Sequence, residues 1–267
     1  MKIWAIATNT FAGFLRDRLL IVVFIILLGI VLLLMSPMLA YKAVTTAANA
    51  AQMQALVLSE VAAIMSFLSG CGSFFAALAA ATAVAAEMKS GTIQAVMARP
   101  VKRWQFLAGK YLSVMMLMLC YVVLMLGMSY LLAWMGGERI QSAPWLLILY
   151  PMARYAIYAA LGILFVTFMH TAVAFGMVFL VAVLTTLLAP TAPLGGHLAP
   201  WVHTALYSVL PSTGLLSEDR FLSITSANLH PVSWLDHVAT LAYGFDYALV
   251  CLLLAMWSFH YRTLRRE

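Results

Sequence analysis

Residues 87–110 read EMKSGTIQAVMARPVKRWQFLAGK, and they lie between two apolar runs that are each long enough to cross a bilayer. This polar insert is too short to form a domain, and its pattern is too regular for a simple turn. It is basic, which is typical of segments that lie against the inner face of a membrane. The insert therefore predicts a chain that crosses the membrane before and after it, with residues 87–110 at the cytoplasmic surface.

The composition of the whole chain agrees with a membrane protein. It has 267 residues, of which 65% are hydrophobic and 9% are charged, and its mean hydropathy is +1.00. Soluble domains carry roughly 25% charged residues, so this chain lacks the polar side chains to cover a water-exposed globule. The net charge of +6 comes from residues that flank apolar runs, which indicates contact with anionic lipid headgroups rather than nucleic acid.

Six apolar runs are long enough to cross the membrane, since a crossing needs about 20 apolar residues for ~30 Å of hydrocarbon. The tract from 148 to 189 is divided at His170 into two spans joined by a tight turn. The sequence thus predicts an all-α membrane protein with a single transmembrane domain over 1–267. Its spans are 19–40, 61–86, 111–135, 148–169, 171–189 and 238–259.

The second of these spans is rich in glycine, serine and alanine. Small residues let helix backbones approach closely in a membrane, where lipid supplies no hydrophobic drive for association. Residues 61–86 are therefore predicted to form an interior helix or one that faces a second copy of the chain.

The distribution of Lys and Arg orients the spans, because cytoplasmic loops are enriched in both. With both termini in the cytoplasm, the inner side carries Lys2, Arg16, Arg18, Lys89, Arg99, Lys102, Arg103, Lys110, Arg262, Arg265 and Arg266, whereas the outer side carries Lys42, Arg139 and Arg220. Residues 1–18 and 260–267 are therefore predicted to be cytoplasmic. Residues 190–237 fall outside, where prolines and aromatic residues predict short re-entrant or interfacial helices.

The insert contains one short helix, predicted over 90–100. Ile93, Val96 and Met97 are spaced at i, i+3 and i+4 and form one apolar stripe, whereas Ala98 falls on another face. A serine or threonine can cap the start of this helix, and the proline at its end disfavours helix in the residue before it.

The motif around this helix runs Glu87-x-x-x-Gly91-Thr92-Ile93, followed by Arg99-Pro100-Val-x-Arg103-Trp-x-Phe-Leu-x-Gly-Lys110. It resembles the cytoplasmic coupling region of type-2 ABC exporter permeases. Residues 1–18 are similar to the amphipathic helix with which these permeases begin, and the last span with its basic tail is similar to theirs. The resemblance covers nearly the whole chain in order and spacing.

The resemblance implies a transport subunit without catalytic residues, located in the bacterial inner membrane. Such permeases work in pairs, here as a homodimer among membrane lipids, together with nucleotide-binding ATPase subunits. This chain has no Gly-x-x-x-x-Gly-Lys-Ser/Thr phosphate loop, since Gly109-Lys110 lacks the earlier glycine and the following serine or threonine. ATP and Mg²⁺ are therefore expected on the partner subunit, with no cofactor or metal bound by this chain.

The resemblance also assigns the coupling of ATP hydrolysis to the insert. Closure of the ATPase subunits would push on the helix at 90–100 and tilt the second and third spans. Ile93, Val96 and Met97 would enter a groove of the ATPase, while charged residues on either side would set the position of the helix. The expected coupling residues are Glu87, Gly91, Thr92, Ile93, Val96, Met97, Arg99, Pro100, Arg103 and Lys110.

Two charges are predicted at membrane depth, Arg154 in the fourth span and Asp246 in the sixth. A charge at the bilayer centre costs about 2.5–3.5 kcal/mol on insertion scales, so such residues usually pair or face a cavity. One interpretation is an Arg154–Asp246 ion pair that lines the exit. In the other, Arg154 reaches the outer headgroups with its long side chain, and Asp246 is hydrated.

Two other functions stay open from the residues alone. A polytopic membrane enzyme would need clustered catalytic side chains, and the polar candidates Arg154, His170 and Asp246 fall at different depths. An ATP-independent channel or carrier would contain inverted repeats and broken midplane helices, and neither is apparent in the sequence. The cysteines and methionines are interpreted as packing residues rather than metal ligands. The substrate stays open, because fold analogy does not identify it.

Overall fold

The computed structural model of the chain is built from helices. The residues that it describes are 2–18, 21–22, 25–26, 29–30, 50–89, 102–136, 144–187, 201, 209–217 and 233–261. Their helices are α1 (Lys2–Phe14), α4 (Ala50–Lys89), α6 (Arg103–Gly136), α7 (Pro144–Phe168), α8 (Thr171–Leu187), the 3-10 helix η2 (Thr213–Leu216) and α10 (Trp234–Tyr261). These residues contain no strand, which confirms the all-α class predicted from the sequence.

Four helices contain a segment that is long and apolar enough to cross a membrane, so the chain is a multi-pass membrane protein. These segments are Val61–Glu87, Arg103–Leu131, Trp145–Phe168 and Trp234–Phe259. They overlap the second, third, fourth and sixth predicted spans. Helix α8 is apolar but has only 17 residues, so its membrane crossing stays a prediction.

Two predicted elements are described in part or not at all. Of the first predicted span, 19–40, the structure describes residues 21–22, 25–26 and 29–30, all of them helical. The helix predicted at 90–100 lies outside the described residues. Within the predicted outer segment 190–237, the described residues include η2 and the start of α10, which begins at Trp234 rather than at residue 238.

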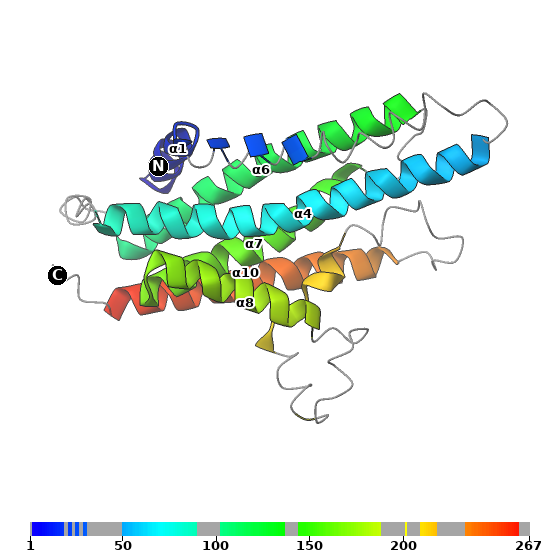
Figure 1. Cartoon of the computed structure of the whole chain (residues 1–267). Helices are drawn as coiled ribbons and strands as arrows, with labels where there is room; N and C mark the ends of the chain where they lie inside the picture. Colours follow the sequence, from blue (N-terminus) through cyan, green and yellow to red (C-terminus); the bar gives the residue numbers. More distant parts are fainter. Residues whose placement is uncertain are drawn as a thin grey trace.

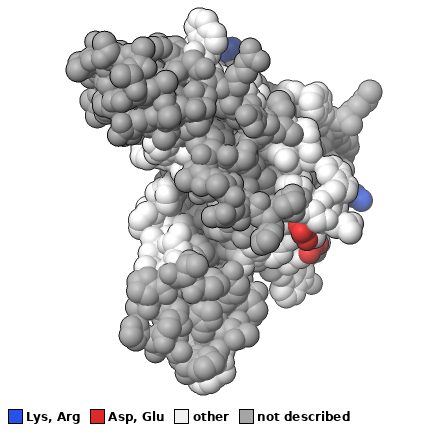
Figure 2. Space-filling view, turned by 90° about the vertical axis from the view of Figure 1, so that its right-hand side faces the viewer, with Lys and Arg blue, Asp and Glu red and all other residues white. Residues whose placement is uncertain are grey.

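The helices α4, α6, α7, α8 and α10 run side by side, and α1 lies across one end of them (Figure 1). The end of α4, the start of α6 and the end of α10 all lie at this same end (Figure 1), which we call the α1 end of the bundle. At the opposite end, the described surface is mostly uncharged, with small basic and acidic areas (Figure 2).

Helix α7 lies at the centre of the bundle. In its 18-residue apolar stretch, which is long enough to cross a membrane, 78% is buried, compared with 28–56% in the corresponding stretches of α4, α6 and α10. It packs against all three of these helices and against α8. Helices α7 and α8 meet around His170, which is exposed and whose carbonyl accepts a hydrogen bond from Ala174 N at 2.8 Å.

Helices α4 and α7 approach most closely at Gly162. A Cβ atom added there would lie 2.8 Å from the carbonyl oxygen of Ala77 and 3.3 Å from the Cβ of Ala80. Both alanines are completely buried. The small-residue run of the second span therefore faces α7 inside this chain, and its small side chains permit the close backbone contact that stabilises helix pairs in lipid.

Candidate functional site

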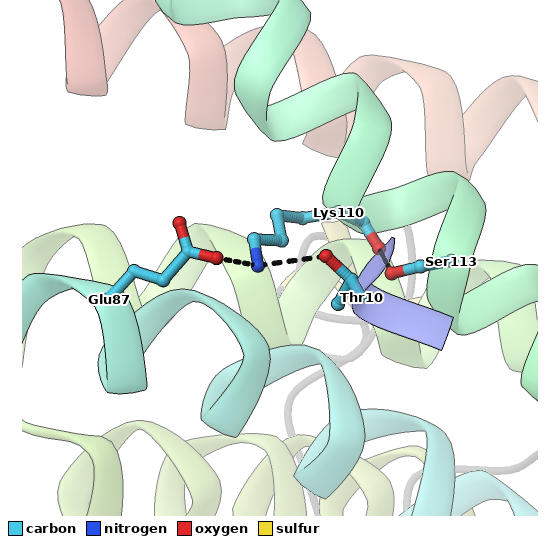
Figure 3. A network of polar contacts seen from close by, with 4 residues as sticks. All are labelled: Thr10, Glu87, Lys110 and Ser113. Atoms are coloured by element: carbon cyan, nitrogen blue, oxygen red, sulfur yellow. Dashed lines mark hydrogen bonds and ion pairs between the residues drawn. The ribbon is translucent and has the colours of Figure 1, made fainter. Parts of the chain in front are cut away.

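A network of three polar side chains connects α1, α4 and α6 at the α1 end of the bundle. Lys110, in the second turn of α6, forms an ion pair with Glu87 near the end of α4. Its Nζ also donates a hydrogen bond to Thr10 Oγ1 of α1 at 3.0 Å. Figure 3 shows the ammonium group between the two acceptors. We call these residues the Glu87–Lys110–Thr10 network.

The charge of Lys110 is enclosed by the protein. Its side chain is 4% exposed, whereas that of Glu87 is 29% exposed. The Nζ atom lies 5.5 Å from the centre of the Phe106 ring, a separation at which a cation and a ring attract each other. Since an unpaired buried charge is costly, the ion pair holds the end of α4 against the start of α6.

Helix α1 rests directly on the backbone of α6. A Cβ atom added to Gly109 would lie 2.8 Å from Ile6 Cγ2 and 3.2 Å from the carbonyl oxygen of Ile3. Only a glycine permits this approach, and it brings Thr10 within reach of Lys110. A pocket of about 290 Å³ adjoins the network, with polar lining from Asn9, Thr10, Asp17, Thr82, Glu87 and Lys110.

Arg103 connects the start of α6 to the end of α10. Its Nη1 donates to the carbonyl oxygen of Phe259 at 3.2 Å, within the last turn of α10. Carbonyls there lack a partner in their own helix and carry partial negative charge, so a guanidinium stabilises them. The rings of Phe106 and Phe259 stack beside this contact, with centroids 6.2 Å apart.

The structure thus pairs two of the residues that the sequence assigned to coupling, Glu87 and Lys110, on the helices that flank the predicted coupling helix. It places a third, Arg103, at the start of α6 against the end of α10. The other coupling candidates lie outside the described residues: Gly91, Thr92, Ile93, Val96, Met97, Arg99 and Pro100. The hydrogen bond that Thr10 accepts from Lys110 was not predicted from the sequence. There, Thr10 is one of several polar residues in an amphipathic segment, and no motif distinguishes it.

The Arg154–Asp246 ion pair, one of the two interpretations of these charges, is not formed in this structure. Arg154 Nη1 donates to Ser69 Oγ of α4 at 2.7 Å, and its Nη2 donates to the carbonyl oxygen of Leu216 in η2 at 2.8 Å. Asp246 is exposed on α10.

Two tyrosines of α10 hold residues 209–217 near Arg154. The backbone N–H of Ser212 donates to the Tyr243 hydroxyl at 2.8 Å, and the Tyr247 hydroxyl donates to the carbonyl oxygen of Val209 at 3.0 Å. The spacing of four residues places both tyrosines on one face of the helix. The sequence contains that spacing, but it does not identify the backbone groups that the hydroxyls bind.

Comparison with known proteins agrees with this architecture. The family model described as "ABC-2 family transporter protein" matches residues 4–264 of the chain. A search of curated proteins found no match. Because the family match runs through the helices of the bundle and both flanks of the predicted coupling helix, the chain belongs to the ABC-2 transporter family.

Proposed function

We propose that this chain is the permease subunit of an ABC exporter in the bacterial inner membrane, with both termini in the cytoplasm. It acts as a homodimer with separate ATPase subunits, which bind ATP and Mg²⁺ and carry out hydrolysis. The chain itself supplies the membrane pathway and no catalytic residue. Membership of the ABC-2 transporter family supports this function, as does a sequence without a phosphate loop.

The Glu87–Lys110–Thr10 network is the observation that supports the coupling mechanism best. Glu87 and Lys110 belong to the two helices that the predicted coupling helix joins, and their ion pair makes those helix ends move together. Thr10 extends the same connection to α1. A force applied by the ATPase at 90–100 would therefore move three helices as a unit instead of bending one loop.

Two further contacts carry the movement into the bundle. Arg103 and Phe106 connect the start of α6 to the end of α10, and both α4 and α10 pack along the central helix α7. In this mechanism, ATP-driven closure of the partner tilts α4 and α6 relative to α7. The tilt changes access to the space between these helices at the end opposite α1.

Val96→Asp tests the docking of the coupling helix on the ATPase. A charge in the middle of the apolar stripe would be desolvated in the partner's groove, so we expect loss of transport and of permease-stimulated ATPase activity, with normal membrane insertion. Ala98→Asp is the matched control, because it adds the same charge on another face of the helix. Equal transport by the two variants would contradict the docking role.

Reconstitution of the chain in liposomes separates the export function from the alternative functions. The exporter should be inactive in liposomes that hold the chain without its ATPase. Transport at full rate in such liposomes would indicate a carrier or channel, whereas turnover of a lipid or peptide by the isolated chain would indicate a membrane enzyme.

A further inference from the structure

Arg154 is a cation within a membrane-length segment of α7, and its described partners are neutral. Its guanidinium donates to a serine hydroxyl and to a backbone carbonyl, those of Ser69 and Leu216. In the described part of the chain, no carboxylate lies within ion-pair distance of it. Cations in this setting usually have a counter-ion or face a cavity that holds one.

The guanidinium also has donors that these contacts do not use. It carries five N–H groups in a planar fork, and the two hydrogen bonds account for two of them. The Nε atom is buried and has no hydrogen-bond partner among the described residues. Among the residues that the structure describes, Arg154 therefore has no counter-charge, and it retains N–H groups suited to an oxyanion.

A pocket of about 300 Å³ adjoins Arg154 between α4, α7, α8 and η2. Its lining combines Phe74 and Val183 with the hydroxyl residues Ser73, Tyr158, Thr186 and Thr213. Ser73 and Thr186 already donate to carbonyl oxygens of their own helices, at 3.1 Å and 2.7 Å. Arg154 is consequently the group in this pocket that selects the charge of a ligand.

An apolar surface continues from the pocket along α8. Phe179, Val183 and Thr186 are spaced at i, i+4 and i+7, which places them on one face of that helix. The ring of Phe179 is half exposed and lies 5.3 Å from the ring of Phe74. Since small-molecule sites usually measure about 300–1,000 Å³, this pocket suits a headgroup with part of a tail rather than a large compound.

We propose that the Arg154 pocket binds the oxyanion of an amphiphile, a phosphate or carboxylate headgroup whose apolar tail lies along Phe74 and Phe179. That such an amphiphile is the cargo rests on the export function proposed above. The binding itself needs only this chain. The ligand can come from the surrounding lipid or from a free amphiphile, and the experiment below distinguishes the two.

Decyl phosphate and the neutral decyl maltoside are the probes, added to the purified full chain in phosphatidylcholine nanodiscs and followed by tryptophan fluorescence. We expect decyl phosphate to bind about tenfold more tightly than decyl maltoside. Arg154→Gln should abolish this preference, since glutamine retains a polar N–H donor but carries no charge. Arg16→Gln is the matched control, because it removes a charge from an exposed position, and it should retain the preference.

A second variant tests the pocket without changing Arg154. Thr186→Phe should fill the pocket and prevent binding of decyl phosphate. Val173→Phe places the same ring at an exposed position elsewhere on α8, and it should bind normally. This pair keeps the test valid if Arg154→Gln fails to fold.

Nanodiscs that contain phosphatidylglycerol identify the source of the ligand. If they weaken decyl phosphate binding, a lipid headgroup occupies the pocket; if they leave it unchanged, the pocket takes a free amphiphile, and both results support the proposal. Equal affinity for the two probes, or a preference that survives both Arg154→Gln and Thr186→Phe, would overturn it. Because no ATPase is present, a negative result would leave the Val96→Asp test of export unaffected.

Discussion

Lys110 is a buried cation whose partners come from two different helices. Lysine side chains are rarely buried completely unless they are paired, and here the pairing joins residues that are 23 and 100 positions away in the sequence. The two charges of the ion pair differ in exposure, 4% for Lys110 and 29% for Glu87. If the ion pair is broken, the Glu87 carboxylate stays in contact with water, whereas the Lys110 ammonium stays enclosed by the protein.

Glu87→Gln should therefore lower the free energy of unfolding by about 2 kcal/mol, because it leaves a buried ammonium without its counter-charge. Lys110→Met should cost less, because the remaining carboxylate reaches water. Thermal unfolding in detergent would measure both as decreases in Tm. Asp236→Asn, which changes an exposed carboxylate on α10, is the control. A larger loss for Lys110→Met than for Glu87→Gln would contradict this account of the network.

At the scale of elements, the packing of α4 on α7 depends on the absence of side-chain atoms at a few positions. Gly162 faces the backbone of α4 at Ala77, and a backbone atom cannot move aside as the end of a flexible side chain can. Gly176 of α8 is also within a helix, but a Cβ atom there would have nothing within 4 Å. The same substitution should thus have opposite effects at the two glycines.

Gly162→Ala should destabilise the protein by about 1–3 kcal/mol, since the added methyl group forces the two helices apart. Gly176→Ala should be neutral or stabilise the protein by up to about 1 kcal/mol through the higher helix propensity of alanine. The Tm values of both variants in one detergent would check this. An unchanged Tm for Gly162→Ala would indicate that α4 and α7 do not pack as described.

At the scale of the whole molecule, three helix ends and α1 gather at one end of the bundle (Figure 1). Helix η2, whose residues Thr213 and Gly214 line the Arg154 pocket, lies away from that end (Figure 1). In the proposed topology, the α1 end faces the cytoplasm, where the ATPase acts. The pocket then lies toward the outer leaflet. Helix α7 connects the two regions, because it packs against both α4 and α10.

Cysteine labelling should verify this orientation. In a variant with Cys71, Cys120 and Cys251 replaced by alanine, Ala98→Cys should react with a membrane-impermeant maleimide only in inside-out vesicles. Ser233→Cys, next to the start of α10, should react only in intact cells. The basic residues at the α1 end keep that end in the cytoplasm, so position 233 at the other end of α10 faces outward. Labelling of both positions from the same side would refute the topology.

From the sequence, Glu87, Arg103, Lys110 and Arg154 were identified as candidate site residues, but the residues that they contact were not. The reason is that α4, α6 and α7 are apolar on nearly all sides, so periodicity does not define which face of each helix turns inward. The Arg154–Asp246 ion pair was one of two interpretations, and it rested only on both charges lying at membrane depth. Depth does not specify rotation about the helix axis, and in this structure Arg154 contacts α4 and η2 instead.

The sequence by itself determined that this protein is an all-helical, multi-pass membrane protein. In hydrocarbon every backbone N–H and C=O needs a partner, and a helix satisfies these groups within one continuous apolar segment, so local sequence suffices. Only the tertiary structure decided which side chains meet, because partners such as Lys110 and Thr10, or Arg154 and Leu216, are 100 and 62 positions apart. Such contacts follow from how each helix is rotated and packed, which close approaches like that at Gly162 determine.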